Sequence, residues 1–148
     1  MKRISHINGL LKKIYRFYNA VLLSELAQRG FNDLRPSFLE ILTFICETQG
    51  PSIKQIGEFC GLKKQTMTSH LNELDKRGYI FKKLGSNDKR EQLVFLTEYG
   101  EKFKLNLMEA ITELEKSYTR RLGEVELNRI ELILQNVHAR LNESPSIH

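Results

Sequence analysis

Hydrophobic residues recur at steps of three and four positions along most of the chain, which is the spacing of one face of an α-helix. This pattern predicts helices over 10–26, from Pro36 to about 49, over 97–122 and over 124–141. At about 1.5 Å per residue the helix over 97–122 would run roughly 40 Å, which is long for a chain of 148 residues. We therefore expect a mainly helical protein.

Two short helices are expected in the middle of the chain. Ser52 and Gln55 match a capping box, and Gly61 ends the helix that this box begins. A second short helix follows at once and ends at Gly78, and two short helices joined around a glycine form a helix-turn-helix. The inner face of the second helix would carry Met67, Leu71 and Leu74.

Two β-prone runs follow, over 79–84 and 92–96, and a polar segment over 85–90 separates them. They predict a β-hairpin with a polar tip, which is the wing of a winged helix. The expected fold class is thus mainly α with a small β-hairpin wing (α+β). It is a winged helix-turn-helix with long N- and C-terminal helices.

Positive charge is concentrated around the helix-turn-helix and the hairpin. The formal net charge is +5, and residues 62–92 carry four of these five charges, since they hold eight basic and four acidic residues. Such a block is typical of a surface that binds the phosphates of a nucleic acid, although an ordinary solvated surface would also show it.

The second short helix carries the groups best suited to DNA. With its apolar side inward, it presents amides, hydroxyls and an ammonium group that suit base edges and phosphates in a major groove. Lys63 and Lys64 stand at its N-terminus, where the helix dipole makes each cation unfavourable by about 0.3–1 kcal/mol. Two lysines at an unfavourable position indicate that a phosphate binds at this helix N-terminus. The presented residues are Lys64, Gln65, Thr68, Ser69 and Asn72.

The hairpin tip holds an acidic and a basic residue two positions apart. On an extended segment Asp88 and Arg90 would point the same way, so Asp88 would orient the Arg90 guanidinium for a narrow minor groove. The alternative is an ordinary exposed ion pair. Lys82 and Lys89 add basic groups to the same hairpin.

Motifs of enzymes and metal sites are absent from the sequence. It has no phosphate-binding glycine loop, no Gly-x-Ser-x-Gly elbow and no metal-binding spacing of histidines or cysteines. We therefore expect no enzyme, no metal and no cofactor. Cys46 and Cys60 have apolar neighbours and predict buried thiols of a reducing compartment, hence a cytoplasmic protein. No run is apolar enough to predict a membrane span.

Three segments together resemble the wing signature of the MarR family, the multiple-antibiotic-resistance type of bacterial regulator, as it runs into the family's long helix. They are Leu74-Asp75-Lys76-Arg77-Gly78-Tyr79-Ile80, Asp88-Lys89-Arg90 and Leu96-Thr97-Glu98-Tyr99-Gly100. The resemblance implies a homodimer whose first and last helices interlock, with recognition helices in successive major grooves of a near-palindrome and wings in the flanking minor grooves. It places the recognition residues on Lys64, Gln65, Thr66, Thr68 and Ser69, and the wing pair on Asp88 and Arg90.

The sequence thus predicts a transcriptional regulator, a repressor, that binds double-stranded DNA as a homodimer. Residues 33–100 would form the winged helix-turn-helix and 1–32 with 101–148 the helical dimerisation region, within a single compact domain overall. A protein-binding winged-helix adaptor and an enzyme with an unrecognised site are the alternatives; the adaptor would need an apolar or neutral outer face on 63–72. The expected DNA-binding residues are Lys63, Lys64, Gln65, Thr66, Thr68, Ser69, Asn72, Lys82, Lys89 and Arg90.

A small aromatic or phenolic ligand that releases the DNA is left open by the same reasoning. Aromatic side chains of the first two helices could line an apolar cleft for it, although packing in the core is the ordinary role of such residues. The candidates are Tyr15, Tyr18 and Phe38.

Overall fold

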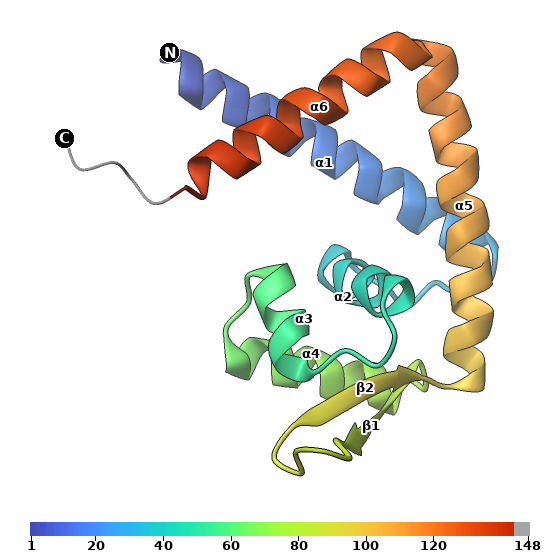
Figure 1. The fold of residues 1–148 in the computed structure, drawn as a ribbon. Helices are drawn as coiled ribbons and strands as arrows, with labels where there is room; N and C mark the ends of the chain where they lie inside the picture. Colours follow the sequence, from blue (N-terminus) through green and yellow to red (C-terminus); the bar gives the residue numbers. More distant parts are fainter. Residues whose placement is uncertain (144–148) are drawn as a thin grey trace. The chain divides into compact units, whose positions relative to one another are not determined.

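The computed structural model describes residues 1–143, which form six helices and one two-stranded sheet (Figure 1). All the expected elements are present. The first helix begins at Arg3 rather than at residue 10, because Ile4 and Ile7 continue its apolar spacing past Gly9. The elements are α1 (Arg3–Gln28), α2 (Pro36–Glu47), α3 (Ile53–Cys60), α4 (Lys64–Lys76), β1 (Ile80–Leu84), β2 (Gln92–Leu96), α5 (Glu98–Leu122) and α6 (Glu124–Leu141).

The chain divides into two compact units, Met1–Ile111 and Thr112–His148, where one compact domain was expected. The first unit contains α1, the helix-turn-helix, the hairpin and the first half of α5, while α6 belongs to the second unit. The end of the expected dimerisation region, 144–148, lies outside the described residues. A functional division at residues 33 and 100 stays a prediction.

The core of the first unit lies between α2, α3, α4 and the sheet. The helix α2 begins with Pro36 at a position where the missing N–H costs nothing, and it buries most of its apolar residues. The inward stripe expected for α4 is confirmed, since Met67, Leu71 and Leu74 are all buried. The helices α1 and α5 add buried residues to this core, and its other large members include Leu22, Leu26, Phe31, Phe38, Leu39, Ile41, Leu42, Ile45, Ile56, Tyr79, Ile80, Val94, Phe103 and Leu107.

The ends of α3 fix the turn of the helix-turn-helix. The capping box is present: the Gln55 backbone N–H donates to Ser52 Oγ at 3.0 Å, and the Ser52 N–H donates to Gln55 Oε1 at 2.9 Å. Gly61 ends α3 in the left-handed region, with φ of 66°, which glycine adopts at little cost. The chain then enters α4 after Lys63.

The two strands pair antiparallel, with Ile80 opposite Leu96 and Leu84 opposite Gln92. The hairpin is tied to the turn between α2 and α3, because the Val94 N–H donates to the Pro51 carbonyl oxygen at 2.9 Å. It therefore stands next to α4 as a wing (Figure 1). The expected fold class, a winged helix-turn-helix, is confirmed.

The start of α5 packs directly on the backbone that leads into β1. Thr97 caps α5, as its Oγ1 accepts from the Gly100 N–H at 3.0 Å while its hydroxyl donates to the Gly78 carbonyl oxygen. A Cβ added to Gly100 would stand 2.1 Å from the Tyr79 carbonyl oxygen. Only glycine allows this approach.

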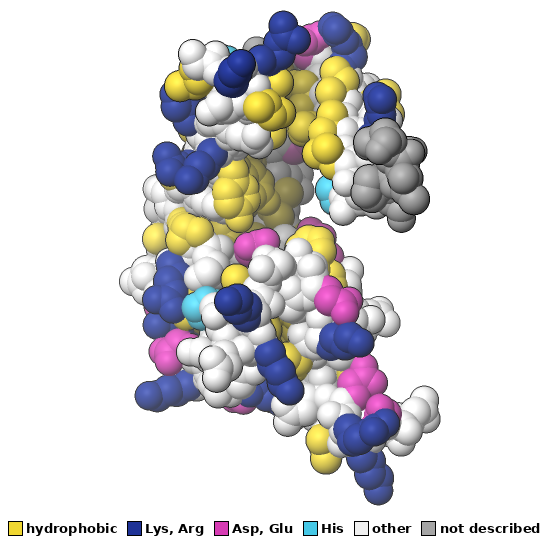
Figure 2. All heavy atoms as spheres, turned by 90° about the vertical axis from the view of Figure 1, so that its left-hand side faces the viewer, with side chains coloured by type: hydrophobic (Ala, Val, Ile, Leu, Met, Phe, Trp, Pro, Cys, Tyr) yellow, Lys and Arg dark blue, Asp and Glu magenta, His cyan; other side chains and the backbone are white. Residues whose placement is uncertain are grey.

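Hydrophobic side chains remain exposed on α1 and on α6. In the single chain α6 has no buried residue, and its apolar stripe is open to solvent. The outer turns of α1 are exposed in the same way, and Figure 2 shows apolar side chains at the surface. The exposed apolar residues include Ile4, Ile7, Leu10, Leu11 and Ile14 on α1, and Ile130, Ile133, Leu134, Val137 and Leu141 on α6.

Candidate nucleic-acid interface

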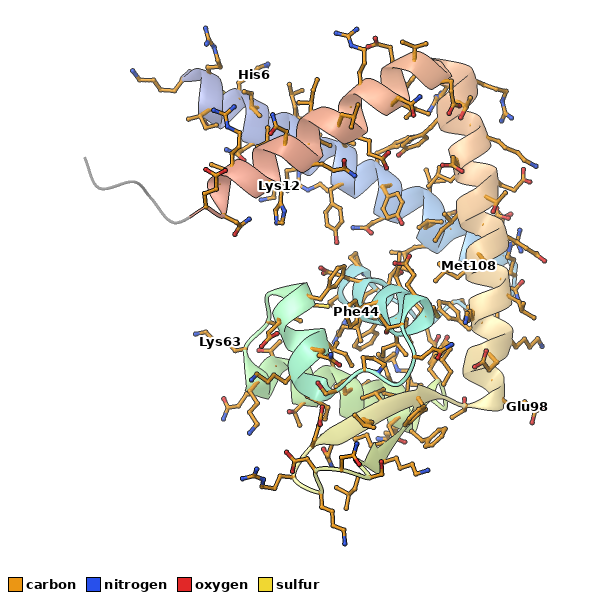
Figure 3. The ribbon with its side chains drawn as sticks, in the orientation of Figure 1. His6, Lys12, Phe44, Lys63, Glu98 and Met108 are labelled. Carbon is orange, nitrogen blue, oxygen red and sulfur yellow. The ribbon has the colours of Figure 1, made fainter. Side chains whose placement is uncertain are left out.

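The N-terminus of α4 presents two lysines and no internal cap. Lys63 precedes the helix, and no side chain of the described residues caps it. The first helical bond runs from the Met67 N–H to the Lys63 carbonyl oxygen at 2.9 Å, so the N–H groups before Met67 have no partner within the helix. The Lys63 side chain points away from the helices (Figure 3). This end of α4 suits an anion.

The outer face of α4 is polar and open to solvent. Gln65, Ser69 and Asn72 are exposed and Thr68 is half-buried, so the structure brings these predicted residues together on one face. Thr66 is exposed but lies on a flank, since each residue turns the helix by about 100°. The outer face therefore offers amide and hydroxyl groups, as base edges require.

The wing contacts this face through one pair of side chains. Lys82 of β1 donates from Nζ to Oδ1 of Asn72, which stands on the outer face of α4. The sequence predicted both residues for the interface but not their contact, because they come from different elements. The bond ties the wing to the face that would read DNA.

The tip of the wing holds Arg90 by a turn, and not by an extended segment as expected. Asp88 Oδ1 accepts from the Arg90 backbone N–H at 3.0 Å and from Arg90 Nε at 3.3 Å. The Glu91 N–H donates to the Asp88 carbonyl oxygen at 3.1 Å, which closes the turn. The Arg90 side chain is 93% exposed, so its guanidinium is oriented yet free to meet a partner. Lys89 is exposed beside it.

A groove runs between α3, α4 and the wing. Three basic and three acidic residues line it: Lys54, Lys64 and Arg90, and Glu58, Asp88 and Glu91. Lys54 was not among the predicted site residues, because a single lysine near the start of α3 carries no signal in the sequence. Figure 2 shows Lys and Arg side chains spread over the whole face in view, its lower end included.

The opposite flank of α4 carries a cluster that sequence reasoning missed. Phe38, a candidate for ligand binding, is buried and packs edge-on against His70, with ring centroids 5.3 Å apart. The Cζ atoms of Arg35 and Arg77 lie 4.2 and 5.0 Å from its centroid. Phe38 is therefore a core residue beneath two arginines and does not line an open cleft.

The other two ligand candidates lie on α1, where Tyr15 is exposed and Tyr18 half-buried. Neither lines the groove beside the wing. No three His, Cys, Asp or Glu side chains of residues 1–143 converge as metal ligands would. Among the described helices, none combines the length and apolar character that crossing a membrane requires.

Both cysteines are expected to resist thiol reagents in the folded protein. Burial raises the pKa of Cys46 to about 12 and that of Cys60 to about 11. At pH 7.5 the Cys60 thiolate fraction would be about 100-fold smaller than for an exposed thiol of pKa near 9. Iodoacetamide labelling followed by mass spectrometry should thus be slow until the pH approaches 11 or denaturant is added. Labelling at pH 7.5 as fast as in the unfolded chain would contradict this.

Comparison with known proteins settles the family of the winged region. The sequence model described as the MarR family matches residues 33–91, which span α2, α3, α4, β1 and the wing tip. The winged helix-turn-helix region belongs to the MarR family. The resemblance inferred from the wing motifs is confirmed.

Relatives of the MarR-type region are transcriptional regulators by name. The regulator Hpr of Bacillus thuringiensis is 32% identical over 77 residues, which is 52% of this chain and 42% of Hpr, and Hpr of Bacillus cytotoxicus matches equally. The chain thus spans under half of the length of these relatives. Their names agree with the transcriptional regulator that the sequence predicts.

Solved structures share the MarR-type fold over nearly the whole chain. A MarR mutant from E. coli, solved with operator DNA, has a TM-score of 0.76 at 19% identity and covers 93% of this chain and 99% of its own. Streptococcus pneumoniae FabT, solved with DNA, has a TM-score of 0.74 at 22% identity and covers 95% and 98%. At these identities the likeness establishes the fold alone.

Proposed function

We propose that this chain is a transcriptional regulator that binds double-stranded DNA, with α4 in a major groove and the wing in the adjacent minor groove. The observation that carries the proposal is the outer face of α4, where exposed Gln65, Ser69 and Asn72 stand beside the uncapped end at Lys63. A protein-binding adaptor would need an apolar or neutral face there. MarR and FabT, which share this fold, have been solved with DNA, and this supports DNA binding as the function.

The proposed binding unit is a homodimer on a near-palindromic site. The exposed apolar stripes of α1 and α6 support it, because such surfaces are seldom left in water. Two copies related by a twofold axis would present two α4 helices to successive major grooves. We propose repression as the outcome, since a bound dimer would obstruct transcription from its site.

Release of the DNA by a small aromatic or phenolic ligand is a lesser part of the proposal. It now rests on Tyr15 and Tyr18 of α1, since Phe38 is buried. The exposed ring of Tyr15 is the group that such a ligand would meet first.

Selection of bound duplexes from a random pool tests the proposal directly. A palindromic consensus with half-sites about one helical turn apart would support α4 docking and the homodimer together. Selection of a single half-site would support DNA binding and contradict the dimer. Failure to enrich any sequence at low salt, with folded protein, would contradict the proposed function and favour the adaptor.

Variants of α4 and of the wing are expected to act differently on the selected duplex. Gln65→Ala should reduce the binding free energy on that duplex by about 1–3 kcal/mol and on random DNA by much less, because an amide that bonds to a base edge distinguishes one base from another. Lys89→Ala should weaken binding to both duplexes by a similar factor. It should also reduce the steepness of the plot of log affinity against log salt concentration by about 0.9 for each phosphate that the lysine no longer neutralises. Binding titrations at several salt concentrations measure both effects. The reverse assignment of effects would overturn the docking.

A further inference from the structure

Arg35 is a cation that stacks on an aromatic ring and has no counter-ion among the described residues. It precedes α2, and its guanidinium lies over the ring of Phe38, with Cζ 4.2 Å from the centroid. Phe38 is 1% exposed, so the ring is a fixed platform, whereas Arg35 itself is exposed. Within residues 1–143 no carboxylate forms an ion pair with Arg35. Stacking thus orients the guanidinium and leaves its N–H donors available.

Arg77 lies on the same ring but its charge is balanced. Its Nε atom pairs with Glu73 Oε1 at 3.0 Å, and its NH1 group donates to the Asp33 carbonyl oxygen and lies 4.0 Å from the Asp33 carboxylate. The two arginines therefore have different roles. Arg77 joins α4 to the segment before α2, whereas no carboxylate of residues 1–143 pairs with the charge of Arg35.

The charge of Arg35 acts on His70 of α4. Burial and the positive charge of Arg35 both lower the pKa of His70, whose ring packs edge-on against Phe38. A lowered pKa favours the uncharged imidazole, which does not repel a cation beside it, so Arg35 and His70 can share the same ring.

The position of Arg35 relative to α4 is opposite to that of the wing. His70, which faces Phe38, and Asn72, which contacts Lys82 of the wing, are two residues apart and thus about 200° apart around the helix. A helix about 10 Å wide fills a major groove about 12 Å wide, so groups on its two sides meet the phosphates of the two opposite walls.

We propose that Arg35 binds a backbone phosphate on the wall of the major groove opposite the wing, so that α4 is clamped from both sides. The inference rests on the proposed function and adds a contact to it. A guanidinium can bind two phosphate oxygens at once, and the stack on Phe38 orders it before DNA arrives. The contact would position α4 without reading the sequence.

The test compares Arg35→Ala, Arg35→Lys and the control Arg120→Ala on the duplex selected above and on a random duplex. Arg120 is exposed on α5, and its substitution removes the same charge outside the winged region. Arg35→Ala should weaken binding to both duplexes by a similar factor. It should also lower the steepness of log affinity against log salt concentration by about 0.9 per bound winged region, so that the loss of affinity between 50 and 200 mM salt becomes about 3.5-fold smaller. Arg35→Lys should restore part of the affinity, and Arg120→Ala should change neither quantity.

Ethylation of single phosphates locates the contact. In the wild-type complex, ethylation of one particular phosphate per half-site should block binding, and in Arg35→Ala it should no longer do so. That phosphate should lie across the major groove from the phosphates whose ethylation no longer matters in Lys89→Ala. If Gln65→Ala lowers specific binding while Arg35→Ala leaves the affinity, slope and interference pattern unchanged, the clamp is wrong and the proposed function stands. An Arg35-dependent phosphate on the wing side would also overturn the clamp. If the wild-type chain binds neither duplex, both proposals fail.

Discussion

Leu134→Glu is expected to convert the protein to monomers and to lower its affinity for a duplex with two half-sites by roughly 100-fold or more, because linked binding of two half-sites supplies that factor. Leu134 lies in the middle of the open apolar stripe of α6 and is 43% exposed in the single chain. If a second copy covers the stripe, a glutamate there would be buried without a partner. Sedimentation velocity measures the mass and electrophoretic titration the affinity.

The matched control for this prediction is Ala139→Glu. Ala139 is exposed on the same helix, five residues on and on another side, so the variant adds the same charge away from the stripe. It should remain dimeric with unchanged affinity. A Leu134→Glu protein that stays dimeric and binds normally would show that α6 does not form the interface.

Gly100→Ala should destabilise the winged unit by about 3 kcal/mol and lower its Tm by roughly 10 °C. The added Cβ would stand 2.1 Å from the Tyr79 carbonyl oxygen. The start of α5 and the segment before β1 cannot easily move apart, because the Thr97 hydroxyl is hydrogen-bonded to both Gly100 and Gly78. Thermal unfolding by circular dichroism measures the effect.

Gly57→Ala provides the comparison for the same substitution. Gly57 lies inside α3, and a Cβ there would stand 3.5 Å from the Leu62 carbonyl oxygen, which is an ordinary contact. Alanine should be neutral there or stabilise by up to about 1 kcal/mol, because it favours helix. Equal stability of both variants would contradict the close approach inferred at Gly100.

Local patterns explain how much of the fold was predictable from the sequence. The capping box at Ser52, the glycine at Gly61 and the stripe through Met67 each lie within a few neighbouring residues, and each was found where the pattern placed it. The hairpin was predictable for the same reason, since β-prone runs flank its polar tip.

Contacts between distant residues explain what the sequence did not reveal. The stack on Phe38 brings Arg77 of α4 to a ring far away in the sequence, beside the nearby Arg35, so an apolar stripe alone could not tell a core ring from one lining a ligand cleft. The turn at Asp88 was missed because alternation of side chains assumes an extended backbone, whereas an aspartate can bond to the backbone two residues on.

The hydrogen bond from Lys82 to Asn72 affects whether the Asn72 amide can donate or accept a hydrogen bond at a base. Its carbonyl oxygen already accepts from the Lys82 ammonium, which leaves the amide N–H donors as the groups that could meet a base. In a major groove such a group matches purine N7, guanine O6 and thymine O4, and it opposes the amino group of cytosine. The wing would thus restrict Asn72 to acceptor atoms on a base edge, through a side chain that itself lies outside α4.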